Sequence, residues 1–270
     1  YRITSTLGVP AMIAAMTEAQ IARPRDVSSL VFMAHGGSPI ATEVVRRAVG
    51  AFPNAEFCHL YGATELSPLA TGLMGEQHLL ESERGRSCGQ PIIGTEIRMM
   101  DADGNEMPRG EVGELAVRGT NVMQGYWNKP EQTAAALRGG WYYSGDLGFM
   151  DEDGYVMLVD RAKDMIVSGG ENVYGSEVEE ALYLHPAVLE AAVFGVPDEH
   201  WGEAVHAVVV LRNEVSAEEL IGFCREKIAG YKVPKGITFQ TDALPKSGPG
   251  KVLKRELRRP FWEGRERQIG

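Results

Sequence analysis

A lysine near the end of the chain stands in a setting that calls for an anionic partner. Lys251 lies in PKSGPGKVLKREL (residues 245–257), where a proline and glycine turn ends at Gly250 and a short basic helix is expected to begin. The first turn of a helix carries the positive end of the backbone dipole, so a cation there gains nothing from the helix itself. The pattern indicates a partner supplied from elsewhere, and an exposed lysine after a surface turn is the alternative.

A second group of polar side chains follows a predicted strand, in YGATELSP (residues 61–68). Open α/β sheets bind ligands at the carboxyl ends of their strands. The ring of Tyr61 can stack on a base, the hydroxyl of Thr64 can hydrogen-bond a phosphate, and the carboxylate of Glu65 can hold Mg²⁺, which prefers oxygen ligands. A plain strand-to-loop turn with an exposed Glu65 fits equally well.

Two glycine turns offer further contacts to a nucleotide. GGSP (residues 36–39) ends one predicted strand and opens a helix, where free amide groups and the absence of side chains let a flat ligand approach the backbone. YYSGDLG (residues 142–148) places Asp146 after a glycine turn at the start of a strand, where its carboxylate can accept both hydroxyls of a ribose. Ordinary tight turns remain the alternative for both segments.

The segment VDRAKDMIVSGGENVYGSEVE (residues 159–179) combines charge with a glycine loop. Asp160 and Arg161 stand at its start, and Gly169–Gly170 follow. Charged side chains at a junction require partners or solvent, which makes this the natural place for a domain swivel. The boundary between two domains is therefore predicted near Asp160.

Periodicity and turn signals predict the elements that position these residues. Within residues 28–60, a strand (SLVFMA), a glycine turn, an amphipathic helix (IATEVVRRAV) and a second strand (AEFCHL) indicate an α/β sheet, which is taken to extend to about residue 85. Residues 86–160 alternate short strands with the turn signals DADG and DEDG, which predict hairpins in a small β-barrel-like subdomain.

The last part of the chain, residues 161–270, is predicted to be a separate compact α+β domain. Three predicted strands (DMIV, LEAAVFGV and AVHAVVVL) alternate with helices that begin at Ser176 and Ser216. Each serine is followed three residues later by a glutamate, Glu179 or Glu219, which is the capping-box pattern of a helix start. At ~150 residues per domain, a chain of 270 residues suits about two domains.

Composition argues against several classes of function. The chain has 27 basic and 37 acidic residues, a net charge of −10, which disfavours nucleic acids and anionic membranes as partners, although residues 246–270 are locally basic. No apolar run approaches the ~20 residues that span a bilayer, so we expect no integral membrane segment. Three cysteines without a CxxC pair favour the reducing cytoplasm.

The five segments, in this order, resemble the motifs of the adenylate-forming superfamily, and most closely those of its AMP-forming acyl-CoA synthetases, the fatty-acid and aryl-acid CoA ligases. The resemblance runs from about Ser28 to Trp262. It implies ATP-dependent activation of a carboxylic acid, expected to be a medium- or long-chain fatty acid, to an acyl-adenylate, followed by transfer to coenzyme A. ATP (released as AMP), Mg²⁺ and coenzyme A are the implied cofactors. Residues 1–160 are then the C-terminal part of the large AMP-binding domain, and residues 161–270 are the small mobile domain.

By this resemblance, one set of residues belongs to the nucleotide pocket of the large domain. Its members are Gly36, Gly37 and Ser38 beside adenine, Tyr61 as the stacking aromatic with Gly62 next to it, Thr64 and Glu65 at the phosphates and magnesium, and Asp146 at the ribose. His35, Gly62 and Leu66 are expected to line part of the acyl pocket, although His35 can equally be a histidine of the core.

A second set lies in the small domain or at its boundary. Arg161 is implied on the ribose side, Asp160 as the hinge, Gly169 and Gly170 at the pantetheine tunnel, and Lys251 as the catalytic lysine. The partner that Lys251 lacks is then the substrate itself, because a carboxylate that attacks an α-phosphate brings two anions together and an ammonium offsets their repulsion. Rotation about Asp160 is expected to exchange Lys251 for the glycine loop between the two half-reactions.

One feature of the superfamily has no counterpart in the sequence. The glycine-, serine- and threonine-rich phosphate loop, of the TSGTTG type, occurs nowhere in the 270 residues, and the chain begins with Tyr1 rather than Met. The resemblance therefore implies that the N-terminal half of the enzyme is missing and that the chain alone is inactive. A decayed or split copy that only binds a nucleotide or a protein partner is one alternative, and an aryl-acid ligase is another. The acyl chain length and homo-oligomer formation stay open.

Overall fold

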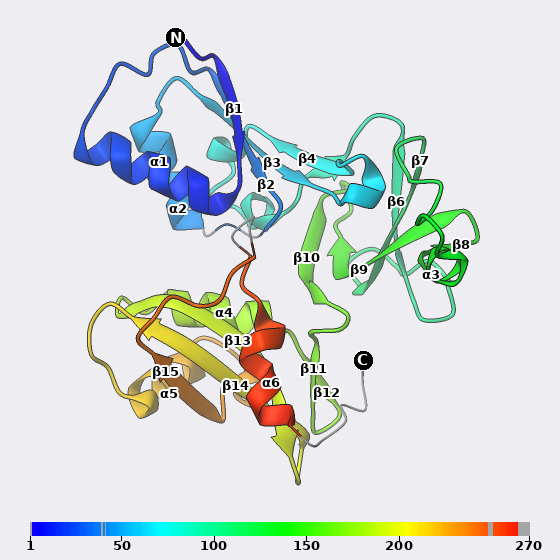
Figure 1. The fold of residues 1–270 in the computed structure, drawn as a ribbon, viewed down its shortest axis with the longest axis vertical. Helices are drawn as coiled ribbons and strands as arrows, with labels where there is room; N and C mark the ends of the chain where they lie inside the picture. Colours follow the sequence, from blue (N-terminus) through cyan, green and yellow to red (C-terminus); the bar gives the residue numbers. More distant parts are fainter. Residues whose placement is uncertain (1, 39, 41, 248–250, 264–270) are drawn as a thin grey trace. The chain divides into compact units, whose positions relative to one another are not determined.

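The computed structural model describes residues 2–38, 40, 42–247 and 251–263, and the chain forms two compact units, Tyr1–Leu158 and Val159–Gly270. Figure 1 shows the elements of both units. Gly250, the proposed turn residue before Lys251, lies outside the described residues. Among the described residues, no helix combines the length and the apolar character that are needed to cross a bilayer.

The first unit begins with a five-stranded sheet whose strands follow each other in chain order. They are β1 (Ser5–Gly8), β2 (Phe32–Gly36), β3 (Glu56–Tyr61), β4 (Thr71–Met74) and β5 (Gln90–Pro91). β1, β2 and β3 are parallel, and β4 returns antiparallel to β3. Helices α1 (Pro10–Ala22) and α2 (Thr42–Ala51) make the two parallel crossovers, so the predicted strand–helix–strand unit is confirmed.

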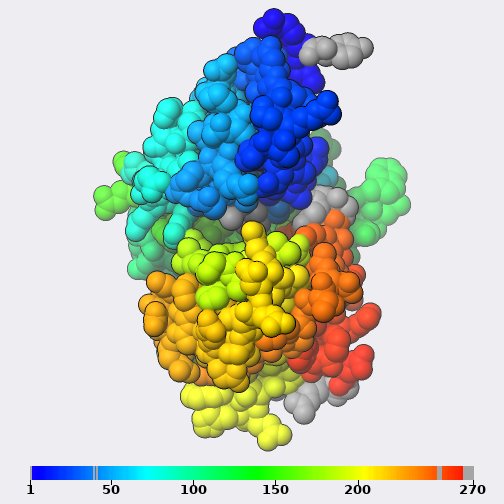
Figure 2. Space-filling model, turned by 90° about the vertical axis from the view of Figure 1, so that its left-hand side faces the viewer, coloured from blue at the N-terminus to red at the C-terminus, as the bar shows by residue number. Residues whose placement is uncertain are grey.

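One hydrophobic core joins these helices to the sheet. Ile13 of α1, Val45 of α2 and Met33 of β2 are buried in it. α2 exposes its charged residues on the opposite side, as its amphipathic pattern predicts. α1 carries apolar residues on several sides and leaves Met12 and Ile21 exposed. Figure 2 shows the surface of this N-terminal part of the chain in blue.

The second part of this unit is an antiparallel sheet in the order β10, β9, β7, β6, with β8 paired to β9. Its strands are β6 (Thr95–Met100), β7 (Gly113–Gly119), β8 (Leu137–Arg138), β9 (Trp141–Met150) and β10 (Val156–Arg161), and helix α3 (Pro130–Ala136) precedes β8. Short 3₁₀ helices lie before it: η1 (Thr64–Leu66), η2 (Glu76–His78) and η3 (Glu83–Arg86). The two predicted hairpin turns are confirmed, because Asp101 and Asp151 each accept a backbone N–H four residues later.

The second unit is built on a sheet in the order β12, β11, β14, β13, with β15 paired parallel to β14. Its elements are β11 (Ile166–Ser168), β12 (Glu171–Val173), α4 (Gly175–Tyr183), β13 (Val188–Asp198), β14 (Gly202–Leu211), α5 (Ala217–Arg225), η4 (Gly230–Lys232), β15 (Gly236–Gln240) and α6 (Lys254–Trp262). Side chains of successive residues of β13 pack into two different hydrophobic cores. Val193 packs with residues of α4 and α5, whereas Phe194 packs with Leu244 and with Leu257 of α6.

Of the two predicted capping boxes, the serine cap of one forms. At α5, the hydroxyl of Ser216 accepts the backbone N–H three residues later, at 3.1 Å. The prediction at Ser176 is wrong, because α4 begins one residue earlier and the Ser176 hydroxyl donates to the carbonyl of Val159. The carboxylate of Glu179 accepts a backbone N–H of β13 instead. Both side chains of the predicted cap, Ser176 and Glu179, thus bind backbone groups of strands instead of the first turn of α4.

Two histidines, His35 of β2 and His59 of β3, stack on each other between neighbouring strands. His35 has no exposed surface, its Nε2 lies 2.6 Å from Oε2 of Glu76, and its ring stacks on His59 with 4.9 Å between the centroids. His35 is therefore a histidine of the core rather than the lining of an open pocket. Burial, reinforced by His35, lowers the pKa of His59 to about 4.

The stability of the first unit should fall in mild acid. The pKa of His59 is 6.5 in the unfolded chain and about 4 in the folded one, so within this window the unfolded chain binds the extra proton and unfolding is favoured as the pH falls. We expect a loss that approaches about 1.4 kcal/mol per pH unit. In urea unfolding between pH 4 and 6.5, the free energy of unfolding of the wild type should fall with pH, and in His59→Gln this contribution should be absent. The exposed His200→Gln control should retain it, and an unchanged slope in His59→Gln would contradict the explanation.

Candidate functional site

Tyr61 and Asp146 meet across 85 residues of sequence. The Tyr61 hydroxyl donates to Oδ2 of Asp146 at 2.6 Å. Burial and the neighbouring carboxylate of Asp146 raise the pKa of Tyr61 above its ordinary value, so the phenol keeps its proton and remains a donor. Because Tyr61 ends β3 and Asp146 lies in β9, this bond joins the α/β sheet to the antiparallel sheet.

Asp146 lies within β9, and the prediction that it starts a strand is wrong. Gly145 has a φ of +75°, a left-handed conformation that glycine tolerates, and the pairing of β9 with β7 shifts register beside it. The Gly145 N–H donates to Oε1 of Glu114, and the Asp146 N–H donates to the hydroxyl of Ser144. The glycine that predicted a turn therefore forms a bulge inside a strand, and the bulge directs Asp146 toward Tyr61.

The glycine loop after β2 lies beside Tyr61 because β2 and β3 are parallel neighbours. Gly36 pairs with Leu60, and a Cβ on Gly36 would lie 2.2 Å from the Leu60 carbonyl oxygen, so a larger residue does not fit. Gly37 adopts a φ of +84°. The close approach of Leu60 thus explains the glycine at position 36, and the positive φ explains the glycine at position 37. They also leave the backbone of Gly36, Gly37 and Ser38 at the sheet edge where β3 ends.

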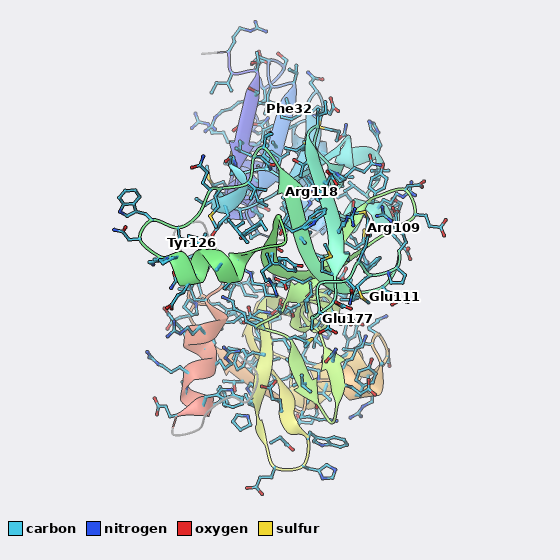
Figure 3. The ribbon with its side chains drawn as sticks, turned by 90° about the vertical axis from the view of Figure 1, so that its right-hand side faces the viewer. Phe32, Arg109, Glu111, Arg118, Tyr126 and Glu177 are labelled. Carbon is cyan, nitrogen blue, oxygen red and sulfur yellow. The ribbon has the colours of Figure 1, made fainter. Side chains whose placement is uncertain are left out.

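Glu65 is held by Tyr126, a residue that no sequence pattern singled out. Thr64 and Glu65 lie in η1, and the Tyr126 hydroxyl donates to Oε1 of Glu65 at 2.7 Å. The N–H of Met123 also donates to the Glu65 carbonyl, at 2.8 Å, so the loop between β7 and α3 is bound to η1 twice. Figure 3 labels Tyr126 on this loop, ahead of α3. Tyr126 stands 61 positions from Glu65, and neither periodicity nor charge marks it in the sequence.

The oxygen donors at η1 are suitable for Mg²⁺. This ion binds proteins through one or two carboxylates and completes its shell with water and phosphate oxygens. Glu65 supplies one such carboxylate, half-buried and oriented by Tyr126, and the exposed Thr64 adds a hydroxyl. Among the described residues, no group of three or more His, Cys, Asp or Glu side chains forms a metal site. The arrangement therefore suits an ion that arrives with phosphates rather than one held by protein alone.

In the second unit, Asp160 is bound to the backbone at both carboxylate oxygens. Oδ1 accepts the N–H of Arg161 and Oδ2 accepts the N–H of Gly175, each at 2.7 Å. Gly169–Gly170 form the turn between β11 and β12 with positive φ angles. The Gly169 N–H donates to the carbonyl of Trp201 at 2.8 Å, so this turn rests on the end of the β13–β14 hairpin.

Lys251 lies ahead of a helix, and the prediction that it occupies the first helical turn is wrong. α6 begins at Lys254, and Lys251 belongs to a short antiparallel pairing in which Lys246 faces Val252. The N–H of Ser247 donates to the Lys251 carbonyl, and the Lys251 N–H donates to the Ser247 hydroxyl. The backbone of Lys251 is thus ordered by a hairpin, so the helix-dipole argument does not apply to it.

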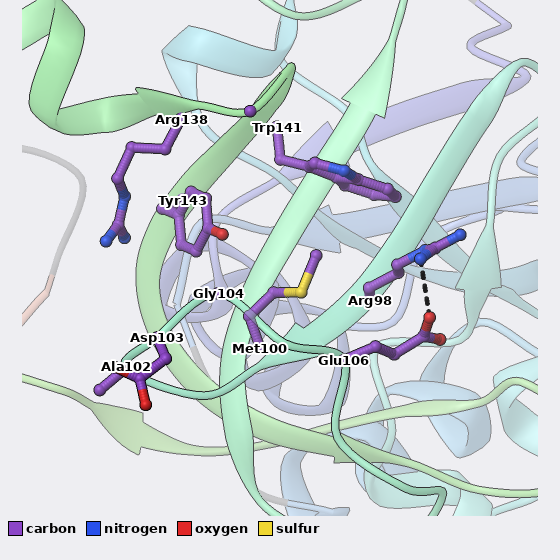
Figure 4. A pocket seen from close by; sticks show the side chains of 10 residues that line it. Arg98, Met100, Ala102, Asp103, Gly104, Glu106, Arg138, Trp141 and Tyr143 are labelled. Carbon is purple, nitrogen blue, oxygen red and sulfur yellow. Dashed lines mark ion pairs between the residues drawn. The ribbon is translucent and has the colours of Figure 1, made fainter.

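A separate hollow of about 380 Å³ lies on the antiparallel sheet (Figure 4). It contains none of the predicted site residues; its walls include Arg98, Glu106, Arg138, Trp141 and Tyr143. Arg98 pairs with Glu106 at 2.8 Å, and the Arg138 guanidinium lies 3.6 Å over the Tyr143 ring. These charges are satisfied by their neighbours, so the hollow does not present an excess of either sign to a ligand.

Two family models match the chain. The model for the AMP-binding enzyme matches residues 1–127, which include the glycine loop and η1, and the model for the AMP-binding enzyme C-terminal domain matches residues 177–251. The chain belongs to the AMP-binding enzymes. The resemblance that the five sequence segments suggested is therefore confirmed.

Relatives of this AMP-binding enzyme are CoA ligases. It is 44% identical over 262 residues to a feruloyl-CoA synthase of an Amycolatopsis species, covering 96% of the chain and 52% of that protein. It is also 44% identical over 260 residues to a long-chain-fatty-acid–CoA ligase of Yersinia pestis, covering 96% of the chain and 45% of that protein.

The solved structures agree on the fold. The o-succinylbenzoate CoA synthetase of Bacillus subtilis, in complex with its acyl-adenylate intermediate, is 34% identical with a TM-score of 0.84, covering 95% of the chain and 51% of that protein. The predicted α/β class and adenylate-forming architecture are thus confirmed. The chain spans about half the length of the relatives that it matches.

The Tyr61–Asp146 contact should contribute measurably to the stability of the AMP-binding enzyme chain. Tyr61→Phe removes the donor and leaves a half-buried carboxylate without it, so we expect the free energy of unfolding to fall by about 1–3 kcal/mol. Tyr155→Phe is the matched control, because its ring packs under Arg84 and the structure shows no hydrogen bond from its hydroxyl. Equal effects of the two substitutions in urea unfolding would argue against this bond as a tie between the sheets.

Proposed function

We propose that this chain carries the second half of an AMP-forming acyl-CoA ligase. In the first half-reaction, a carboxylate oxygen attacks the α-phosphorus of ATP and pyrophosphate leaves, which gives an acyl-adenylate. In the second, the thiol of coenzyme A attacks the acyl carbonyl and AMP leaves. The observation that carries the proposal is the meeting of Tyr61, Asp146 and the glycine loop at the end of β3. Tyr61 and the glycine loop lie within residues 1–127, which match the AMP-binding enzyme family.

The sheet edge suits a nucleoside. The Tyr61 ring offers a flat apolar surface to adenine, beside the backbone of Gly36, Gly37 and Ser38, with Gly62 next in the chain. Asp146 would accept the ribose hydroxyls, because a carboxylate has lone pairs for several donors and needs only one for Tyr61. Arg161 is proposed on the ribose side from the second unit.

Thr64 and Glu65 would hold the phosphate end of the nucleotide. Mg²⁺, when bound, neutralises phosphate oxygens and so lowers the repulsion that an attacking carboxylate meets. Glu65 would bind the ion with the oxygen geometry that Tyr126 imposes on its carboxylate. Thr64, exposed at the start of η1, would donate its hydroxyl to a phosphate.

Lys251 would stabilise the charge of the first half-reaction. A positioned ammonium is worth more at a site prepared for it than in water, because it needs no reorganisation as charge moves onto the phosphate. Asp160 is proposed as the hinge about which the small domain predicted from the sequence, residues 161–270, turns between the two half-reactions. Gly169 and Gly170 would then line the path of the pantetheine arm, where the lack of side chains leaves room for it.

The acid is proposed to be a medium- or long-chain fatty acid, with an aryl acid as the second candidate. Both candidates have a relative at the same identity, a long-chain-fatty-acid–CoA ligase and a feruloyl-CoA synthase. His35 and Leu66, which the sequence suggested for the acyl pocket, are both fully buried in the chain. Leu66 packs into the core of the antiparallel sheet with Leu115, so that expectation needs correction for these two residues. A panel of acids with AMP release as the readout would separate the candidates.

The cellular setting completes the proposal. All three cysteines are free and buried, which is compatible with a reducing cytoplasm. Carboxylic acid, ATP and coenzyme A are the proposed partners, together with the half of the fold that the relatives possess beyond the matched region. Nucleic acid is not proposed as a partner, and homo-oligomer formation stays an open expectation.

The chain alone should not catalyse acid activation. It has no glycine-, serine- and threonine-rich phosphate loop, so ATP lacks a backbone cradle for its β- and γ-phosphates. We expect no acid-dependent exchange of pyrophosphate into ATP above background. The complete enzyme under the same conditions is the positive control. Exchange by the chain alone at rates typical of enzymes would refute the proposal of a half-enzyme, and binding of AMP without exchange by the complete protein would favour a non-catalytic nucleotide-binding copy.

Removal of the Lys251 ammonium should separate the two half-reactions. In the complete enzyme, Lys251→Ala should slow acyl-adenylate formation by about 100-fold or more, because a preorganised charge partner is lost. Thioester formation from supplied acyl-adenylate should be largely spared. Lys246→Ala is the control on the same hairpin, since Lys246 pairs with Glu190 at its surface. Normal acid activation by Lys251→Ala would remove the basis for its proposed role.

A further inference from the structure

A buried ion pair joins the start of α6 to α4. Nζ of Lys254, the first residue of α6, lies 2.8 Å from Oε1 of Glu179, and each side chain is only 18% exposed. The same carboxylate oxygen accepts the N–H of Val193 on β13 at 2.7 Å. Glu179 thereby links three elements of the second unit. Removing one partner of such a pair leaves the other charge buried without compensation, so the contact is sensitive to substitution.

Asp160 lies at the same spot. Its Oδ2 accepts the N–H of Gly175 at 2.7 Å. A Cβ built on Gly175 would lie 3.1 Å from Nζ of Lys254 and 3.4 Å from Oδ2 of Asp160. The ammonium and this carboxylate therefore both lie beside the Cα of Gly175. Burial opposes the charge of Lys254, but Glu179 and Asp160 outweigh it and its pKa is raised. The Lys254 ammonium therefore pairs with Glu179 and lies near the carboxylate of Asp160, the proposed hinge residue.

Lys251 stands three residues before Lys254, so their Cα atoms lie within about 11 Å. The connecting residues are well anchored. Val252 packs against the core that contains Phe194, and the N–H of Leu253 donates to the carbonyl of Pro245 at 2.8 Å. A displacement of the start of α6 is thus transmitted to Lys251 through a short, ordered segment.

We infer that Lys254 is a positioning residue for Lys251, because its ammonium binds the Lys251 hairpin to Glu179 of α4, the helix whose first N–H Asp160 accepts, so that the hairpin and the hinge residue turn as one body. This inference rests on the proposed function in the roles that it gives Lys251 and Asp160. A misplacement of about 1 Å at a reacting group can slow a step by about 100-fold, so the anchoring has a catalytic consequence. If the ion pair were purely structural, its removal would instead lower the stability of the protein and slow both half-reactions alike.

The anchoring can be tested in the chain itself by hydrogen exchange. In Lys254→Met, the amides of Ser247 and Leu253, which close the Lys251 hairpin, should exchange about tenfold faster or more, while the amides of β14 keep their protection. Lys232→Met is the matched control, because Lys232 pairs with Glu177 of the same helix α4 at 2.7 Å and has no contact with α6 in the structure. Unchanged exchange at Ser247 and Leu253 in a folded Lys254→Met protein would overturn the inference.

Catalysis supplies the second test, in the complete enzyme. Lys254→Met should slow acyl-adenylate formation by about 10- to 100-fold and leave thioester formation from supplied acyl-adenylate within about twofold. Lys254→Arg should recover most of the first rate, because it retains a cation between the two carboxylates. Glu179→Gln, which keeps the size of the side chain, should act in the same direction and covers the case in which Lys254→Met does not fold.

The outcomes distinguish the two proposals. A wild-type enzyme that activates no acid removes the proposed function, while the exchange experiment still decides whether Lys254 anchors the hairpin. An active wild type with equal losses in both half-reactions, or with no rescue by Lys254→Arg, overturns the positioning role and leaves the proposed function in place.

Discussion

The hydrogen bond from Tyr61 to Asp146 is the contact on which the rest of the first unit's site depends. It spans two sheets of different kinds, one with parallel strands and one antiparallel, and it is made at the last residue of β3 and at a bulge inside β9. The parallel pairing of β2 with β3 then brings the glycine loop to the same edge. An aromatic ring, a carboxylate and the backbone of the glycine loop are thus brought together by one hydrogen bond and one strand register.

The second unit is organised around a helix start rather than around a sheet edge. Its polar contacts converge on the start of α4. Asp160 binds the first backbone N–H of that helix, and Glu179 on the same helix holds both β13 and Lys254. A proline at position 175 would lack the N–H that Asp160 receives. Gly175 therefore supplies the donor that ties this helix to the proposed hinge residue.

Local signals predicted the local features well. The strand–helix–strand unit, the two Asp-headed hairpin turns and the Ser216 cap follow from residues close in sequence, and each was found where the pattern placed it. The predictions that were wrong concern positions whose backbone or side-chain partners lie outside the helix or turn that the local pattern suggested. The hydroxyl of Ser176 goes to Val159, the glycine before Asp146 belongs to a bulge paired with β7, and Lys251 is ordered by residues before it in the chain.

The residues that were missed follow the same rule. Tyr126 donates a hydrogen bond to Glu65, 61 positions away in the sequence. Lys254 forms an ion pair with Glu179, which is even further away in the sequence. A single sequence contains no periodicity that links such pairs, because they are chosen by the packing of sheets and helices. The chemistry of a site can therefore be listed from motifs, whereas the side chains that orient it emerge only from the fold.

Burial also decides how this chain responds to oxidants and alkylating reagents. Removal from water raises the pKa of Cys58 and Cys224 to about 11 and that of Cys88 to about 12. Thiolate, the reactive form, is therefore scarce at neutral pH in all three places, and reagents that seek it have little to attack. A single cysteine placed on the exposed surface of either unit would therefore accept a fluorescent or spin label without competition from the native thiols.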